Sequence, residues 1–276
     1  MARGYTIAYI AGLQHCGSTL LDLLLNAHSQ AVTVGELFEL PDYANQRKAT
    51  TAETRYGSSC TCGVDSIWDC PFWTAIDEEV RRRAGIGLKE IDINAADPGV
   101  FAAHNELFFD SLAAVTGARL IIDSSKRLGR LSALLHHSAL PVVPVHLLRN
   151  PNGQIYSLIK RGRSAVVEPA AYYRRTTLRT LRLLRGREHV CLRYETLVQD
   201  PEAALRRVLP PLGLEFETAQ LDWAAAERHN LAGNRMRRTA RSDIVAREEW
   251  RDKLGLPRRA LIDFLTLPAT YGTRHY

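Results

Sequence analysis

The chain has 276 residues, of which 46% are hydrophobic and 24% charged, a composition typical of a globular domain with one sizeable core. Its 36 Lys and Arg residues only slightly exceed its 30 Asp and Glu residues, which suits a small anionic ligand and argues against a dedicated nucleic-acid-binding protein. Five cysteines are too few for a disulfide scaffold, and no stretch has the roughly 20 apolar residues that span a bilayer. We therefore expect one cytoplasmic enzyme domain over residues 1–276, and a homodimer of it is compatible with the sequence.

Short β-rich runs alternate with longer runs of helical spacing along the chain. The predicted strands are residues 6–10, 32–34, 120–122, 142–148 and 190–193. The predicted helices are residues 18–27, 100–115, 128–137, 152–161, 170–185 and 202–209. This order predicts an α/β fold of three layers with a central, mostly parallel sheet. Residues 41–97 lack strand patterns, and we interpret them as a helical or loop insertion that forms a lid over the carboxyl edge of the sheet.

The segment GLQHCGST, residues 12–19, follows the first predicted strand and opens the first predicted helix. Its spacing is that of a phosphate loop, in which backbone N–H groups and a helix N-terminus point at one anion. The nucleotide-kinase form of this loop has a lysine where this chain has Ser18, because that lysine reaches the β- and γ-phosphates. A donor without a γ-phosphate, such as 3'-phosphoadenylyl sulfate, does not need it. A glycine-rich turn that binds no ligand is the alternative.

A second anion-binding pattern follows the longest predicted strand. Arg149, in the sequence Leu-Arg-Asn-Pro, can present its guanidinium to a phosphate. Ser157 lies two turns into the next helix, where its hydroxyl could reach the same group. An Arg-Asn-Pro turn alone is more often a capping device, but here it occurs at the right point of the βαβ series.

Together these segments resemble the sulfotransferase family. Residues 12–21 resemble its loop for the 5'-phosphosulfate, residues 149–157 resemble its 3'-phosphate motif, and Tyr194-Glu195 resembles its segment near the adenine. The resemblance spans residues 5 to about 255 and implies a P-loop-like fold. It also implies transfer of a sulfuryl group from 3'-phosphoadenylyl sulfate to a hydroxyl of a carbohydrate, lipid or small-molecule acceptor. The donor-binding residues that it implies are Gln14, His15, Cys16, Gly17, Ser18, Thr19, Leu20, Arg149, Ser157, Tyr194, Asn234 and Arg237.

Further short motifs resemble the bacterial and carbohydrate-type branch of that family. They are Asp123-Ser-Ser-Lys126, Gly233-Asn234 with Arg237, Trp250-Arg251, and Cys60-Thr-Cys62-Gly with Cys70-Pro-Phe-Trp73. Their shared order along the chain carries more weight than any one of them. We expect the loop that contains Asn234 and Arg237 to close over the 3'-phosphate.

The resemblance points to a cation beside the leaving phosphate. The family usually has Lys or Arg immediately before its small-Gly-Ser/Thr-Thr turn, and in this chain that position is His15. Negative charge grows on the bridging oxygen of the donor during transfer, so either protonated His15 or Lys126 should stabilise it. His15 could instead be a neutral turn residue, and Lys126 a surface lysine. Ser124 and Ser125 either cap the following helix or contact the donor.

The acceptor hydroxyl must lose a proton as it attacks, so a general base is expected. Glu36 is the candidate, because it follows the second predicted strand and resembles the Gly-Glu that carries the base in related tyrosine-modifying and carbohydrate-type members. It could instead cap a helix that starts at Leu37. His104, His136 and His137 are rival bases that the sequence does not rank.

The cysteine cluster Cys60, Cys62 and Cys70 could hold zinc if a fourth ligand folded beside it. Cys-x-Cys followed by a gap of seven residues is not a standard zinc-finger spacing. We therefore predict no metal ligands and no metal requirement, with the segment forming a compact loop packed by aromatic residues.

Two other functions fit parts of the sequence. A P-loop kinase would use Mg-ATP, with Asp123 at a strand end as the metal ligand, but it would lack the loop lysine. A catalytically silent nucleotide-binding module would explain His15 in place of Lys or Arg. The acceptor is not identified by any motif.

Overall fold

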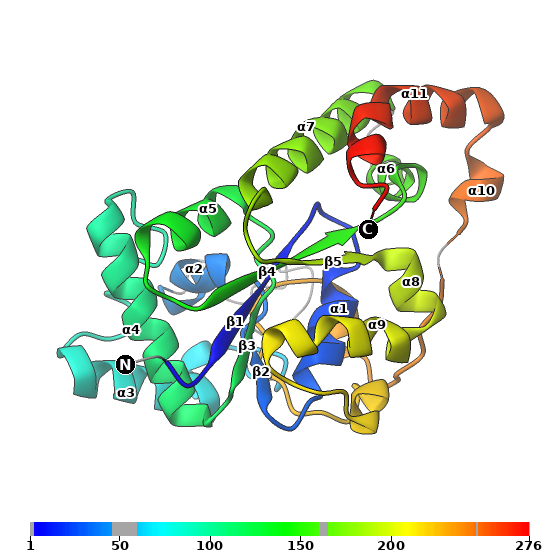
Figure 1. Ribbon diagram of the computed structural model, residues 1–276. Helices are drawn as coiled ribbons and strands as arrows, with labels where there is room; N and C mark the ends of the chain where they lie inside the picture. The colour runs from blue at the N-terminus through cyan, green and yellow to red at the C-terminus, as the bar shows by residue number, and fades with distance from the viewer. Residues whose placement is uncertain (1–2, 46–59, 161–164, 247, 276) are drawn as a thin grey trace.

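A computed structural model describes residues 3–45, 60–160, 165–246 and 248–275 of the chain (Figure 1). Five parallel strands form one sheet in the order β2-β3-β1-β4-β5. They are β1 (Thr6–Ala11), β2 (Ala31–Thr33), β3 (Leu120–Asp123), β4 (Val142–Leu148) and β5 (Val190–Arg193). Every predicted strand occurs within one residue of its expected bounds, so the predicted α/β fold with a parallel sheet is confirmed.

Helices cover both faces of the sheet and form the outer layers (Figure 1). The six predicted helices are present as α1 (Ser18–Asn26), α4 (Pro98–Thr116), α5 (Leu128–His137), α6 (Pro151–Ile159), α7 (Val167–Leu184) and α9 (Pro201–Val208). The described residues also contain α2 (Leu40–Ala44) and α3 (Pro71–Ala84), which fall largely in the predicted helical or loop insertion, and three helices that were not predicted, α8 (Tyr194–Gln199), α10 (Trp250–Lys253) and α11 (Leu256–Gly272).

The central strand β1 supplies a core on each side of the sheet. Ile7 and Tyr9 pack with α4 and α5, whereas Ala8 and Ile10 pack with α1 and α9. Residues that alternate along a strand point to opposite faces, so a strand covered on both faces must be apolar throughout. A third cluster joins α6, α7 and α11 at the carboxyl end of the sheet.

The strand register brings three loops to one edge of the sheet. Tyr9 pairs with Asp123 of β3, and Ala11 pairs with His146 of β4. Because the strands are parallel, the segments that follow β1, β3 and β4 all leave from the carboxyl edge, where folds of this class bind ligands.

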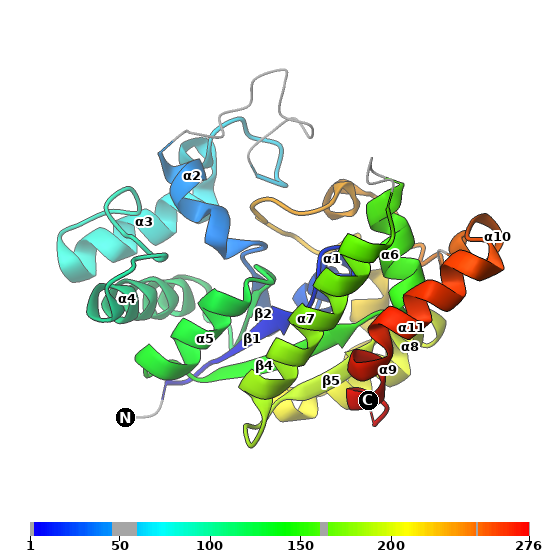
Figure 2. The same cartoon turned by 90° about the horizontal axis from the view of Figure 1, so that it is seen from above.

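Residues 46–59 of the predicted 41–97 insertion lie outside the described residues. In the described part, α3 packs along α4 (Figure 2). Trp73 of α3 is completely buried in the same core cluster as Phe108 of α4. Whether the insertion acts as a lid stays a prediction. No helix in the described ranges combines the length and the apolar character needed to cross a membrane.

Candidate active site

Close packing shapes the loop between β1 and α1. A Cβ atom on Gly12 would lie 2.7 Å from the Leu147 carbonyl oxygen and 2.8 Å from the Cys16 sulfur. Gly17 has φ +101°, and a Cβ atom there would lie 2.4 Å from the ring of Tyr194. Both positions therefore require glycine. Gly17 is also the N-cap of α1 and offers no side-chain cap, so the start of the helix can receive an anion.

The other loop residues divide into exposed and buried positions. Gln14 is exposed and His15 is half-buried, with a left-handed φ of +66°. Ser18 and Thr19 open α1. Cys16 and Leu20 lie in the core, so their side chains face away from a ligand. Any donor contact from these two residues must therefore come from the backbone.

Arg149 joins the phosphate loop to helix α6. Its Nη1 donates to the His15 carbonyl oxygen at 2.9 Å and lies 3.4 Å from the Ser157 hydroxyl oxygen. The guanidinium also lies over the Tyr194 ring, 4.5 Å from its centroid, and only 7% of the residue is exposed. Gln154 adds a second link at 2.8 Å to the carbonyl of residue 14. The structure thus brings the two predicted phosphate motifs together.

Lys126 and Glu36 form an ion pair at the ends of the neighbouring strands β3 and β2. Lys126 Nζ donates to Glu36 Oε1 at 2.7 Å and to the Ser124 carbonyl oxygen at 2.8 Å. The lysine side chain is only 12% exposed. Glu36 occupies the N-cap position of a short 3-10 helix (Leu37–Glu39), but its side chain makes no capping hydrogen bond there. Lys126 is not a surface lysine.

The charge of Lys126 also acts on the phosphate loop and on α1. Burial raises the pKa of the Cys16 thiol, and Lys126 partly opposes that effect. Burial raises the pKa of Asp22 to about 7, although hydrogen bonds from Thr33 and Asn230 and the Lys126 charge favour its ionised form. Asp22 is thus a buried acid on α1 that was not predicted from the sequence.

The late motif lies beside Glu36. Leu231 forms a bridge with Gly35, and its carbonyl oxygen accepts from the Glu36 amide at 3.2 Å. Arg237 is 2% exposed, and its Nη1 donates to the Asn230 carbonyl oxygen at 2.7 Å. Burial lowers the pKa of this guanidinium from its ordinary value. Arg237 therefore stabilises the segment of residues 230–231 that lies beside Glu36.

Asn234 of this motif is exposed, and its side chain accepts a hydrogen bond from the Met236 amide. The segment against the Arg149 motif is instead α10. A Cβ atom on Gly153 would lie 3.1 Å from the Trp250 indole nitrogen and 3.3 Å from Arg149 Nε. Closure of the Asn234 loop over the 3'-phosphate stays a prediction.

The sulfotransferase family profile matches residues 8–218 of this chain. The chain belongs to the sulfotransferase family. Solved structures of sulfotransferases share its fold. The sulfotransferase domain of the Synechococcus PCC 7002 olefin synthase has a TM-score of 0.61 and 19% identity, with coverage of 99% of this chain and 95% of that chain. No curated protein sequence matches the chain.

Two more sulfotransferases show the same architecture. The domain from the curacin biosynthetic pathway has a TM-score of 0.58 and 18% identity over 95% of this chain and 98% of that chain. STF9 from Mycobacterium avium has a TM-score of 0.51 and 12% identity over 95% and 77%. At these identities the likeness concerns the fold, and it confirms the predicted P-loop-like architecture.

In this sulfotransferase, Asp123, which a kinase would need as its metal ligand, has other contacts. Asp123 is fully buried, pairs with Arg130 at 3.2 Å, and accepts hydrogen bonds from Ser125. The predicted helix-capping role of Ser124 and Ser125 is wrong, because the N-cap of α5 is Arg127 and has no side-chain cap. The Ser125 hydroxyl instead accepts from the Phe38 amide at 2.9 Å, which ties the β3 loop to the segment after Glu36.

The rival histidines lie in other parts of the sulfotransferase. His104, on α4, accepts a hydrogen bond at 2.9 Å from the amide of Asp92, which lies in the insertion. His136 and His137 end α5, which runs back to the amino edge of the sheet before β4 begins. That edge is opposite to the one that carries Glu36 and Lys126. Geometry therefore favours Glu36 as the base.

Proposed function

We propose that this sulfotransferase transfers the sulfuryl group of 3'-phosphoadenylyl sulfate to a hydroxyl of a small-molecule or carbohydrate acceptor. The observation that carries this proposal is the position of Arg149, which contacts the phosphate loop through the His15 carbonyl and lies beside Ser157. Two anion sites side by side suit a nucleotide with phosphates on both the 3' and 5' oxygens. Guanidinium groups bind phosphate with strong, charge-assisted hydrogen bonds.

In this proposal the 5'-phosphosulfate lies at the N-terminus of α1. The amides of residues 17–19 and the hydroxyls of Ser18 and Thr19 receive its oxygens, because a helix N-terminus favours negative charge. Arg149 and Ser157 receive the 3'-phosphate. Tyr194, which packs against Gly17 and under the Arg149 guanidinium, contributes a flat apolar surface for the adenine.

The ion pair of Glu36 and Lys126 supplies the acid–base chemistry. The acceptor oxygen attacks sulfur and forms a new S–O bond, its proton passes to Glu36, and the S–O bond to the 5'-phosphate breaks. Negative charge then grows on that phosphate oxygen, and we assign its stabilisation to Lys126. His15 lies on the phosphate loop between β1 and α1, where its protonation would add a second cation.

A kinase function is not favoured by the environment of Asp123. A magnesium ligand needs free oxygens, and this carboxylate is fully buried with Arg130 and Ser125 as partners. The loop position that holds lysine in nucleotide kinases is Ser18.

Thermal unfolding tests the proposed donor. Adenosine 3',5'-bisphosphate at about 100 times its dissociation constant should add about 2.7 kcal/mol of stability and raise the midpoint by several degrees. Mg-ATP at the same concentration should raise it much less. A shift only with Mg-ATP would support the kinase, and no shift with either would favour a module without this donor. Release of adenosine 3',5'-bisphosphate from the sulfated donor, dependent on a hydroxyl compound, then separates an enzyme from a silent module.

A further inference from the structure

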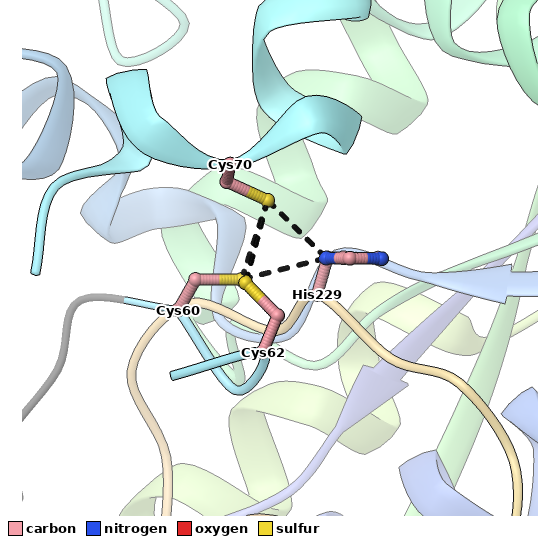
Figure 3. Close-up of side chains that lie close together, drawn as sticks. All are labelled: Cys60, Cys62, Cys70 and His229. Carbon is pink, nitrogen blue, oxygen red and sulfur yellow. Dashed lines mark hydrogen bonds between the residues drawn. The ribbon is translucent and has the colours of Figure 1, made fainter. Parts of the chain in front are cut away.

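Away from the proposed nucleotide site, three cysteines of the insertion meet a histidine from the late part of the chain (Figure 3). The Cys70 sulfur lies 3.2 Å from His229 Nδ1, 3.7 Å from the Cys60 sulfur and 3.6 Å from the Cys62 sulfur. The Cys60 sulfur lies 3.7 Å from His229 Nδ1. One ligand atom from each of the four residues lies within 4.8 Å of every other.

These separations are those of a tetrahedral zinc site. With Zn–S near 2.3 Å and Zn–N near 2.0–2.1 Å, the edges of the tetrahedron are about 3.7 Å between sulfurs and about 3.5 Å between sulfur and nitrogen. The sulfur–sulfur separations of 3.6 Å (Cys62 to Cys70) and 3.7 Å (Cys60 to Cys70) match the sulfur–sulfur edge. The two sulfur–nitrogen distances, 3.2 and 3.7 Å, lie on either side of the sulfur–nitrogen edge.

The surroundings hold His229 in the tautomer that a metal requires. Its Nε2 lies 3.0 Å from Glu227 Oε1, which leaves Nδ1 to face the cysteines. Its ring stacks on Phe72 at 4.7 Å, and its carbonyl oxygen accepts from the Trp73 indole at 3.0 Å. A carboxylate on the far nitrogen is the usual partner of a zinc-bound histidine.

The sulfur geometry does not suit a disulfide. The Cys70 sulfur lies 3.6 Å from the Cys62 sulfur and 3.7 Å from the Cys60 sulfur, far longer than the roughly 2.05 Å of an S–S bond. Cys60 and Cys70 are buried and Cys62 is exposed at the rim. Three thiolates and one imidazole in a closed tetrahedron form a structural zinc set, because a catalytic site keeps one position open.

We propose that Cys60, Cys62, Cys70 and His229 bind one structural zinc ion. The three thiols lose their protons to solvent on binding, and no oxidation state changes. This proposal replaces the expectation of a metal-free loop and does not depend on the identity of the donor.

The ion would fasten the insertion to the wall of the active site. Thr61 already donates to the Arg228 carbonyl and accepts from the Asn230 amide at 2.9 Å. The next residue, Leu231, bridges to Gly35, directly before Glu36. Zinc would therefore join Cys70 to His229, 159 positions later in the chain, and so hold the segment that contacts Glu36.

Metal analysis of the purified full-length chain tests the site. We expect one zinc per chain by plasma mass spectrometry, and much less in Cys62→Ser and His229→Gln. Cys191→Ser, which changes a cysteine of β5 outside the cluster, is the matched control and should keep full zinc. Circular dichroism establishes that each variant is folded. Zinc content that stays unchanged in folded Cys62→Ser and His229→Gln would overturn the proposal.

A second measurement uses the unmodified sequence and so does not depend on the variants folding. After removal of metal under reducing conditions, added Co²⁺ should give the visible absorption of a tetrahedral, thiolate-ligated ion, and one equivalent of Zn²⁺ should abolish it. Glu227→Gln should weaken zinc binding by about tenfold, the low end for a residue that orients a ligand, because Glu227 is largely exposed. Absence of both bound zinc and the cobalt spectrum would contradict the site.

Discussion

Arg149→Ala should weaken the binding of adenosine 3',5'-bisphosphate far more than the binding of adenosine 5'-phosphate. The two nucleotides differ only in the 3'-phosphate that we assign to Arg149 and Ser157. The guanidinium lies 2.9 Å from the His15 carbonyl oxygen, so it also shapes the loop for the 5'-phosphate. Comparison of the two ligands separates these roles.

The magnitude follows from the burial of Arg149. A hydrogen bond to a charged group contributes about 1.5–3 kcal/mol, and this residue is only 7% exposed, so screening by water is weak. We expect the bisphosphate to lose about 10- to 150-fold in affinity beyond any loss for the monophosphate. Arg149→Lys, which keeps the charge but not the paired donors, should fall between wild type and alanine.

Isothermal titration calorimetry measures the affinity of both nucleotides for wild type, Arg149→Ala and Arg149→Lys. Thermal unfolding of the free proteins reports any general loss of stability from the contacts with His15 and the Tyr194 ring. Equal losses for both nucleotides would refute the assignment of the 3'-phosphate to Arg149, and the residue would then be a positioning residue for the loop.

Three further perturbations test the site. Lys126→Ala should lower donor turnover by about 10²- to 10³-fold and change the affinity for the bisphosphate little. The control Lys253→Ala, which changes an exposed lysine, should leave turnover unchanged. A loss mainly of bisphosphate affinity in Lys126→Ala would contradict the assignment. Asp22 keeps its proton in the folded protein up to pH about 7, whereas its ordinary pKa is 3.8, so the unfolding free energy should fall by on the order of 3 kcal/mol as pH rises from 4 to 7. Chemical denaturation should show a smaller fall in Asp22→Asn, and identical pH profiles would refute this. Gly17→Ala should destabilise the protein by about 1–3 kcal/mol and weaken nucleotide binding, because the new Cβ would clash with the Tyr194 ring. An unfolding free energy and a nucleotide affinity both equal to those of wild type would contradict the loop geometry.

The strands were predictable because their environment is simple. The runs Val142–Leu148 and Val190–Arg193 were predicted at their observed bounds, since both are mostly apolar and β-branched and are bounded by segments with other patterns. Helix α11 was missed. Pro268 interrupts its pattern, and apolar residues such as Phe264, 74% exposed, remove the usual contrast between its faces.

The site was predictable where a motif follows a strand. Glu36 and Lys126 were each expected at strand ends, but their pairing depends on β2 lying beside β3, which the sequence does not state. Asp22 looks like an ordinary helical acid, and only its contacts with Thr33 and Asn230 reveal it as buried. His229 carried no signal, because no local spacing joins it to cysteines so distant in the chain.

A crystal structure with adenosine 3',5'-bisphosphate tests the central claim most directly. We predict that the 5'-phosphate lies on the amides of residues 17–19 and that the 3'-phosphate contacts both Arg149 and Ser157, with the adenine beside Tyr194. A 3'-phosphate bound away from Arg149, or a nucleotide bound outside the phosphate loop, would contradict the account.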